Sequence, residues 1–392
     1  MKKFTALHQF YRKILSQCGF DWTFDYFTLN LRRQKIICAI LVFFLYLNTF
    51  NATIFLSSFE SFGIWAVCVI FFCAGSFSCL AALLLFVYGK ECKYLLDWCS
   101  NLYISPTDVR LIRIHDDIFR KAARETILLA KVTFYGFKFL LIVIFLPPIP
   151  LYFFTGTVML PATFYFPGLP YTELPYYLLN YISQFLGVYC ATSVTPILHS
   201  ILVMVVIHAK YQLDLVDATV EVIINDGTIP GKEKDVKGEL EEIIKMHTNV
   251  LGIIRLASRV FSMLLLAYNS AVYFIIGFTF VATQLDKSLI IFSPVAIVSV
   301  VYLGLISYFG SVLYERLTSV GNAIYCSNWY LLPVKHQKTL KLVILQSQRS
   351  KPLTAGDFID LSLVSFLNNQ MSTLSKSGVK GRDLIFFDNL ES

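Results

Sequence analysis

Long apolar stretches alternate with charged segments along most of the chain. Six of them are long enough to cross the roughly 30 Å hydrocarbon core of a bilayer, because an α-helix rises about 1.5 Å per residue. The pattern therefore predicts an all-α fold, a polytopic membrane helical bundle. The six predicted spans are Ile36 to Phe59, Phe62 to Tyr88, Val132 to Phe154, Tyr176 to His208, Arg259 to Thr283 and Leu289 to Leu313.

A seventh apolar stretch begins near Phe358 but stays apolar only through Leu367, about half the length that a spanning helix requires. We treat 358–367 as a partial seventh span. Residues 368–392 form a polar tail, and polar and charged residues at this density do not cross lipid.

Basic residues mark one side of the predicted membrane. Segments 1–35, 89–131, 209–258 and 314–352 contain 7, 8, 6 and 6 Lys or Arg residues. The intervening segments 60–61, 155–175 and 284–288 together contain only Lys287. By the positive-inside rule, the first group is cytoplasmic.

The predicted organisation follows from this charge pattern. A cytoplasmic amino-terminal segment (1–35) precedes a six-span bundle (36–313) with cytoplasmic loops 89–131 and 209–258, and a cytoplasmic segment (314–357) follows it. The first 35 residues have no short apolar core with a small-residue cleavage site, so we expect no cleaved signal peptide. A seven-span G-protein-coupled receptor would have the opposite orientation.

Part of the bundle is predicted to continue beyond the membrane. Segment 236–256 has an apolar stripe at helical spacing, with acidic residues and Lys245 on its other face. Such a stripe packs against another element. Between this segment and the fourth span, residues 225–238 have the Gly, Pro and charge content of a loop. The stripe consists of Leu240, Ile243, Ile244, His247, Leu251 and Ile254.

Composition agrees with a membrane location. The chain has 392 residues, of which 56% are hydrophobic and 15% charged, more apolar surface than one soluble core of this length needs. The net charge of +7 is spread over separate loops and forms no patch, so we expect no nucleic-acid partner. The nine cysteines show no zinc-ligand spacing or paired extracellular set, which favours buried reduced thiols.

The sequence lacks the common catalytic signatures. It contains no phosphate-binding Walker motif, no G-x-S-x-G, no H-E-x-x-H and no G-x-G-x-x-G. The six histidines do not pair at metal-ligand spacing within a helix. We therefore expect no enzyme, no catalytic residues, no metal and no cofactor.

Polar, aromatic and proline residues inside the spans are the candidates for a binding site, since an unsatisfied polar group in hydrocarbon costs several kcal/mol. Pro147, Pro148, Pro150 and Pro196 remove helix hydrogen bonds and either shape a cavity or are packed by neighbouring helices. A mostly aromatic cavity with a few hydrogen-bonding groups is typical of a small-molecule site, although aromatic belts at the interface also place Tyr and Phe here. The predicted ligand-binding residues are Tyr152, Phe153, Tyr177, Tyr181, Gln184, Asn269 and Tyr273.

The carboxyl-terminal third contains a set of closely spaced motifs. Tyr325 and Trp329 lie four positions apart, and a basic segment, 335–351, then leads into Pro352-Leu-Thr-Ala-Gly-Asp-Phe358. These motifs cover about 45 residues and resemble the insect odorant receptor family. The likeness extends weakly over most of the chain through length, span plan and a cytoplasmic amino terminus.

The resemblance implies a function. It implies a tuning subunit of a ligand-gated, non-selective cation channel in the plasma membrane of an olfactory neuron. The partners implied are the odorant co-receptor in a heterotetramer, a small volatile ligand and membrane lipid. The ligand is expected in the outer half of the bundle, with Tyr325 and Trp329 in a cytoplasmic anchor that joins subunits.

One departure from the family pattern leaves alternatives open. The family continues after Phe366 as an apolar helix, whereas this chain becomes polar from Asn368. The chain is therefore either a conducting subunit or a truncated, non-conducting isoform. A gustatory receptor shares the architecture but ends in motifs absent here, and a secondary transporter would need charged residues at the bilayer midplane, for which Lys138 is the one obvious candidate.

Overall fold

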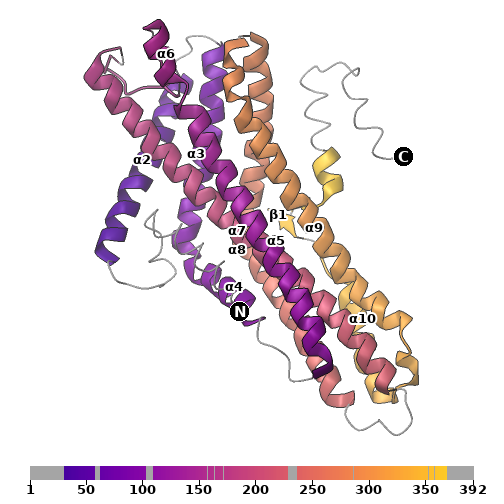
Figure 1. The fold of residues 1–392 in the computed structure, drawn as a ribbon. Coiled ribbons are helices and arrows are strands. Elements are labelled where there is room, and N and C mark those ends of the chain that lie inside the picture. The colour runs from indigo at the N-terminus through magenta and orange to yellow at the C-terminus, as the bar shows by residue number, and fades with distance from the viewer. Residues whose placement is uncertain are drawn as a thin grey trace.

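The computed structural model describes residues 31–368, apart from 58–61, 103–108, 228–235 and positions 157, 163, 171, 286, 352 and 357. These residues form a bundle of long helices (Figure 1). Six stretches within the described part of the chain are long and apolar enough to cross a membrane, which confirms the predicted polytopic α-helical bundle. The helices that supply them are α2 (Leu31–Ser57), α3 (Phe62–Val87), α5 (Val109–Phe145), α7 (Leu174–Gly227), α8 (Val236–Leu285) and α9 (Ser293–Cys326).

Helix α7 is the central element of the bundle. It packs against α2, α3, α5, α8 and α9, and 94% of its most apolar window is buried. A helix of 54 residues is about 80 Å long, far more than the bilayer core needs. It continues through Pro196 without a break. Both α7 and the 50-residue α8 therefore extend well beyond the membrane at one end.

Most of the predicted loops 89–131 and 209–258 are helical. The first contains α4 (Gly89–Asn101) and the beginning of α5, and the second is divided between the ends of α7 and α8. The apolar stripe predicted in 236–256 is confirmed as a packing face, since Leu240, Ile243 and His247 are each at most 2% exposed. Segment 236–256 is continuous with the fifth span, so both belong to one helix.

The third predicted span is divided between two helices in the structure. Helix α5 stops at Phe145, and a short helix, α6 (Pro148–Thr155), begins after a turn at Pro147. Proline has no backbone N–H and suits the first turn of a new helix better than the interior of an old one. Gly156 then ends α6 with a left-handed φ of 68°.

The helix of the sixth span begins later than the sequence pattern predicted. Residues Lys287–Phe292 form the 3₁₀ helix η2, and α9 starts at Ser293 with a proline in its first turn. Since proline is well suited to the start of a helix, the boundary moves from residue 289 to residue 293.

Seven of the eight described cysteines are buried or half-buried. Cys326 is exposed, so the prediction of a buried thiol is wrong for this residue. In α4, outside the spans, burial raises the pKa of Cys92 to about 12, so this thiol is a packing residue and not a nucleophile.

The chain after α9 folds back along it. The 3₁₀ helix η3 (Trp329–Leu331) and helix α10 (Val334–Gln348) follow, and α10 packs on α9. Strands β1 (Thr354–Ala355) and β2 (Ile359–Asp360) then pair as an antiparallel hairpin against α8. Helices α6 and α10 lie at opposite ends of the bundle (Figure 1).

The segment predicted as a partial seventh span, 358–367, starts inside this hairpin. Helical structure begins only at residue 363 and is described to residue 368. The polar tail 369–392 and the first 30 residues lie outside the described residues. The backbone N–H of Leu363 donates to Ser311 Oγ at 2.8 Å, which ties this segment to α9.

Gly310 lets the segment lie directly on α9. A Cβ at this position would collide with the carbonyl oxygen of Leu361 and would lie 3.1 Å from its Cβ. We expect Gly310→Ala to lower the free energy of unfolding by about 1–3 kcal/mol, because overpacking forces backbone shifts. Thermal unfolding of the purified protein in detergent measures this.

Gly277→Ala is the matched control. Nothing lies within 4 Å of a Cβ at Gly277 in α8, so alanine there should leave stability equal or slightly raised. Equal stability of the two variants would contradict the close contact at Gly310.

Candidate ligand-binding site

A cavity of about 120 Å³ lies among six helices. Helices α2, α3, α5, α7, α8 and α9 line it, and Phe164 of the α6–α7 segment completes the wall. An apolar cavity of roughly 150 Å³ in another protein holds benzene. The space therefore fits a molecule of about one ring in size.

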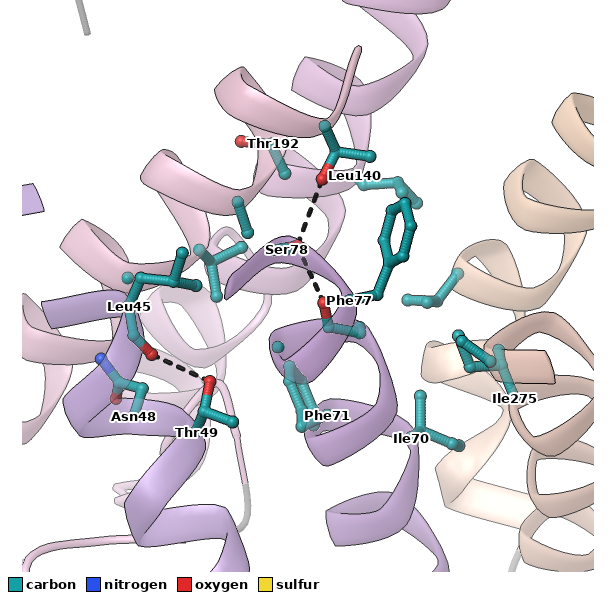
Figure 2. Close-up of a pocket in the computed structure, with 18 of the residues that line it drawn as sticks. Leu45, Asn48, Thr49, Ile70, Phe71, Phe77, Ser78, Leu140, Thr192 and Ile275 are labelled. Atoms are coloured by element: carbon teal, nitrogen blue, oxygen red, sulfur yellow. Dashed lines mark hydrogen bonds between the residues drawn. The ribbon is translucent and has the colours of Figure 1, made fainter. Parts of the chain in front are cut away.

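Aromatic and aliphatic side chains form most of the wall. Phe71 and Phe77 come from α3 (Figure 2). Phe137 comes from α5 and Tyr268 from α8. Such a surface binds a small apolar molecule by shape and dispersion, without directional bonds.

Two glycines bring α2 close enough to close the cavity. A Cβ on Gly75 of α3 would lie 2.5 Å from Thr49 Oγ1, and a Cβ on Gly187 of α7 would lie 2.5 Å from Asn48 Nδ2. Small residues are common where membrane helices approach closely. The Asn48 amide bridges the helices by donating to the carbonyls of Phe44 and Ser183 at 2.7 and 2.8 Å.

The hydroxyl groups of the lining bond to the protein itself. Ser78 Oγ lies 2.8 Å from the carbonyl oxygen of Ala74 and 3.2 Å from Thr195 Oγ1. Thr49 donates to the Leu45 carbonyl at 2.9 Å. Figure 2 shows these bonds as dashed lines at Ser78 and between Thr49 and Leu45. The hydrogens of these hydroxyl groups thus have acceptors within the protein.

An aromatic cluster surrounds His199, one helical turn beyond Thr195 on α7. The imidazole stacks on Tyr302 at 4.5 Å between centroids and contacts Tyr268 and Phe77 at 4.8 and 5.5 Å. Because Phe77 and Tyr268 also line the cavity, the His199 cluster is the layer directly next to it.

The predicted residues Tyr177 and Gln184 bond to the segment between α6 and α7, which contributes Phe164 to the cavity wall, and Tyr181 bonds to the end of α5. Gln184 Nε2 donates to the Phe164 carbonyl at 2.6 Å, and its Oε1 accepts from the Ala162 N–H at 3.0 Å. Tyr181 donates to the Phe145 carbonyl at 2.7 Å. Tyr177 donates to the Met159 carbonyl at 3.3 Å. These side chains lie one layer outside the cavity.

The other predicted ligand residues are distributed around the bundle. Tyr152 and Phe153 of α6 are exposed, Asn269 is buried in α8, and Tyr273 is half-buried one turn further along. The cavity wall contains none of the seven predicted residues, and their contact with a ligand stays a prediction. Of the predicted anchor residues, Tyr325 is exposed and Trp329 half-buried.

Sequence reasoning missed the hydroxyl and small residues that line the cavity. The signal for them was a run of small residues inside the second span, Ala74-Gly-Ser-Phe-Ser-Cys79, which indicates close helix packing in a membrane. No group of three His, Cys, Asp or Glu side chains able to hold a metal ion occurs among the described residues.

His199 provides a test of the cluster. The residue is fully buried, and neither ring nitrogen has a hydrogen-bond partner among the described residues. His199→Phe keeps the ring stack and removes both polar atoms, so it should raise the free energy of unfolding by about 1–3 kcal/mol. Thermal unfolding in detergent checks this.

His208→Phe is the control, because the equally buried His208 ring bonds through Nδ1 to the Met204 carbonyl at 2.8 Å. That variant should be neutral or destabilised. A loss of stability in His199→Phe as large as in His208→Phe would contradict the prediction.

Comparisons with known proteins identify relatives of the whole fold. Residues 64–371 match the family model described as 7tm Odorant receptor. Odorant receptor 82a of Drosophila melanogaster is 26% identical over 167 residues, 39% of this chain. The match spans 40% of the length of that curated relative.

Two solved structures of the insect olfactory receptor OR5 from Machilis hrabei share the architecture. The first has a TM-score of 0.78 and 12% identity, and covers 97% of this chain and 99% of that one. The second, a complex with eugenol, has a TM-score of 0.77 and 11% identity over 95% and 98% of the two chains. At this identity, the likeness shows the fold.

Proposed function

The chain belongs to the 7tm odorant receptor family, and we propose that it is the tuning subunit of a ligand-gated, non-selective cation channel that binds small volatile molecules. It is a multi-pass membrane protein of a receptor family, not of an enzyme family. The apolar cavity of about 120 Å³ is the observation that carries the proposal.

The cavity suits a ligand with few polar groups. Its mostly apolar wall disfavours charged molecules, since no charged side chain lines it to compensate the loss of their hydration. The similar receptor from Machilis hrabei has been solved in complex with eugenol, a one-ring compound, which supports a ligand of that size.

Weak to moderate affinity is expected from so small a ligand. About ten non-hydrogen atoms, at roughly 0.3–1 kcal/mol each, contribute on the order of 3–10 kcal/mol, which corresponds to millimolar to sub-micromolar binding. One methylene changes binding by about 1–3 kcal/mol in an apolar pocket, so responses should be graded across related odorants.

The proposed partner is the odorant co-receptor in a heterotetramer. At the end of the bundle opposite α6, Tyr325, Tyr330, Leu331 and Leu342 are 59% to 70% exposed. These residues lie outside the predicted spans, and large apolar side chains exposed away from lipid are typical of a protein interface. This surface supports the anchor role proposed for Tyr325 and Trp329.

We place the protein in the plasma membrane of an olfactory neuron with its amino terminus in the cytoplasm. The distribution of Lys and Arg between the two sets of connecting segments supports that orientation. It puts the cavity in the outer half of the bundle, on the side from which odorants arrive.

The described cavity does not depend on the polar tail. Its lining residues come from positions 45–299, well before the departure at Asn368. Ligand binding and ion conduction are therefore separable in this chain, and a truncated, non-conducting subunit would still bind odorant. Gating would further require that the ligand bind the open state more tightly.

Filling the cavity should abolish the odorant response. Ala271 of α8 lines the space, and Ala271→Leu adds three carbon atoms to a cavity that holds about one ring. We expect at least a tenfold rise in the dissociation constant of every odorant, and loss of odorant-evoked current in cells that also express the co-receptor.

Ser270→Leu is the matched control, because the neighbouring Ser270 is exposed on the outside of the chain. This variant should bind and respond like the unmodified protein. Unchanged responses in Ala271→Leu would contradict the proposed site, whereas binding without current in the unmodified chain would support the non-conducting alternative.

The orientation has a direct test. An epitope tag before Met1 should be labelled by antibody only after the cells are permeabilised, whereas a tag in the 155–173 segment should be labelled on intact cells. Labelling of the amino-terminal tag on intact cells would overturn the topology, and with it the proposed channel assembly.

A further inference from the structure

We propose that the cavity is selective for ligands that donate a hydrogen bond, small aromatic or aliphatic alcohols, over aldehydes and ketones of the same shape. This inference rests on the proposed odorant-binding function and specifies the ligand chemistry of that site. It follows from the acceptor to which each polar hydrogen of the lining is donated.

The polar hydrogens of the side chains that line the cavity are already donated to acceptors in the protein. The Asn48 amide donates both hydrogens, to the carbonyl oxygens of Phe44 and Ser183. Thr49, Thr192 and Ser299 donate to carbonyls of their own helices at 2.9, 3.2 and 2.7 Å. Tyr268 donates to the Ser299 carbonyl at 3.1 Å.

The remaining two hydroxyls, of Ser78 and Thr195, form a chain of hydrogen bonds in which each donor can be assigned. Ser78 has a single hydrogen and uses it for the Ala74 carbonyl at 2.8 Å. The hydrogen in the 3.2 Å contact between Ser78 and Thr195 therefore comes from Thr195. The chain runs from Thr195 to Ser78 to Ala74, across the interface of α7 and α3.

Thr195 Oγ1 is the open end of this chain. Within the described residues it accepts no hydrogen bond, so two lone pairs are left on an oxygen that is almost fully buried in the wall of the cavity. Hydrogen bonds in a chain polarise one another, which makes the terminal oxygen a better acceptor. The site therefore presents a hydrogen-bond acceptor to a ligand but no free hydrogen-bond donor.

A ligand that donates a hydrogen bond and a ligand that only accepts one differ in the number of hydrogen bonds they add. An alcohol donates to Thr195 Oγ1 and leaves every protein bond in place, so one hydrogen bond is added. A carbonyl oxygen must take the Thr195 hydrogen away from Ser78, which exchanges one bond for another. The alcohol should therefore bind roughly three- to tenfold more tightly than the aldehyde, the equivalent of one net hydrogen bond.

Benzyl alcohol, benzaldehyde and toluene form a shape-matched series for the test. Binding is measured as the ligand-dependent rise in Tm of the purified full-length chain in nanodiscs, with Ala271→Leu as the reference for partition into lipid. The expected order of affinity is alcohol, then aldehyde and toluene with similar values.

Thr195→Val removes the accepting oxygen while Ser78 keeps its bond to Ala74, so no buried donor is left unpaired. In this variant the alcohol should lose its advantage and toluene should bind as before. Thr192→Val is the control, because this hydroxyl also lines the cavity but bonds only to its own helix, and the preference for alcohol should persist.

The outcomes distinguish a failure of the proposed preference for alcohols from a failure of the proposed odorant site. Equal binding of alcohol and aldehyde, or a preference that survives Thr195→Val, would overturn the inference and leave the odorant site standing. Binding of none of the three ligands above the Ala271→Leu reference would overturn the site itself.

Discussion

The bilayer interior does not tolerate unpaired hydrogen-bonding groups, and most of this architecture depends on that constraint. The spans are unbroken helices because a helix satisfies its own backbone. At Pro147 a helix ends and a new one begins, whereas α7 continues through Pro196. Inside the spans, hydroxyls such as Thr49 and Ser78 return their hydrogens to carbonyls one turn earlier. The cavity has the same origin, since its wall is made from helices whose polar groups already bond to the protein.

Close packing around α7 turns these helices into one unit. The contact of α2 with α3 and α7 depends on the absence of side chains at Gly75 and Gly187. The Asn48 amide then joins α2 to α7 by a hydrogen bond. Since α7 also extends through the bundle to the end where α9 and α10 pack together, a ligand beside Thr195 touches a helix that reaches the proposed anchor. This continuity gives the proposed channel a physical route from odorant to subunit interface.

The shell around the cavity shows how polar residues in a span take structural roles. Gln184 and Tyr181 have the amide and aromatic character of ligand contacts, but Gln184 bonds to the backbone between α6 and α7 and Tyr181 to the end of α5. Gln184 thereby positions Phe164, which forms part of the wall. In our proposal, recognition by this cavity depends on shape, with one polar contact at Thr195.

The sequence alone determined the helical class, the six spans and the family resemblance, because apolar length, basic loops and the motif around Tyr325 and Trp329 are local properties of the chain. It also predicted the packing face at Leu240, Ile243 and His247, since helical spacing places them on one stripe. The cavity was decided by the tertiary structure. Which hydroxyl faces a space, and which acceptor takes its hydrogen, depends on how α3 and α7 meet, and Ser78 and Thr195 are 117 positions apart. No periodicity within one helix carries that information.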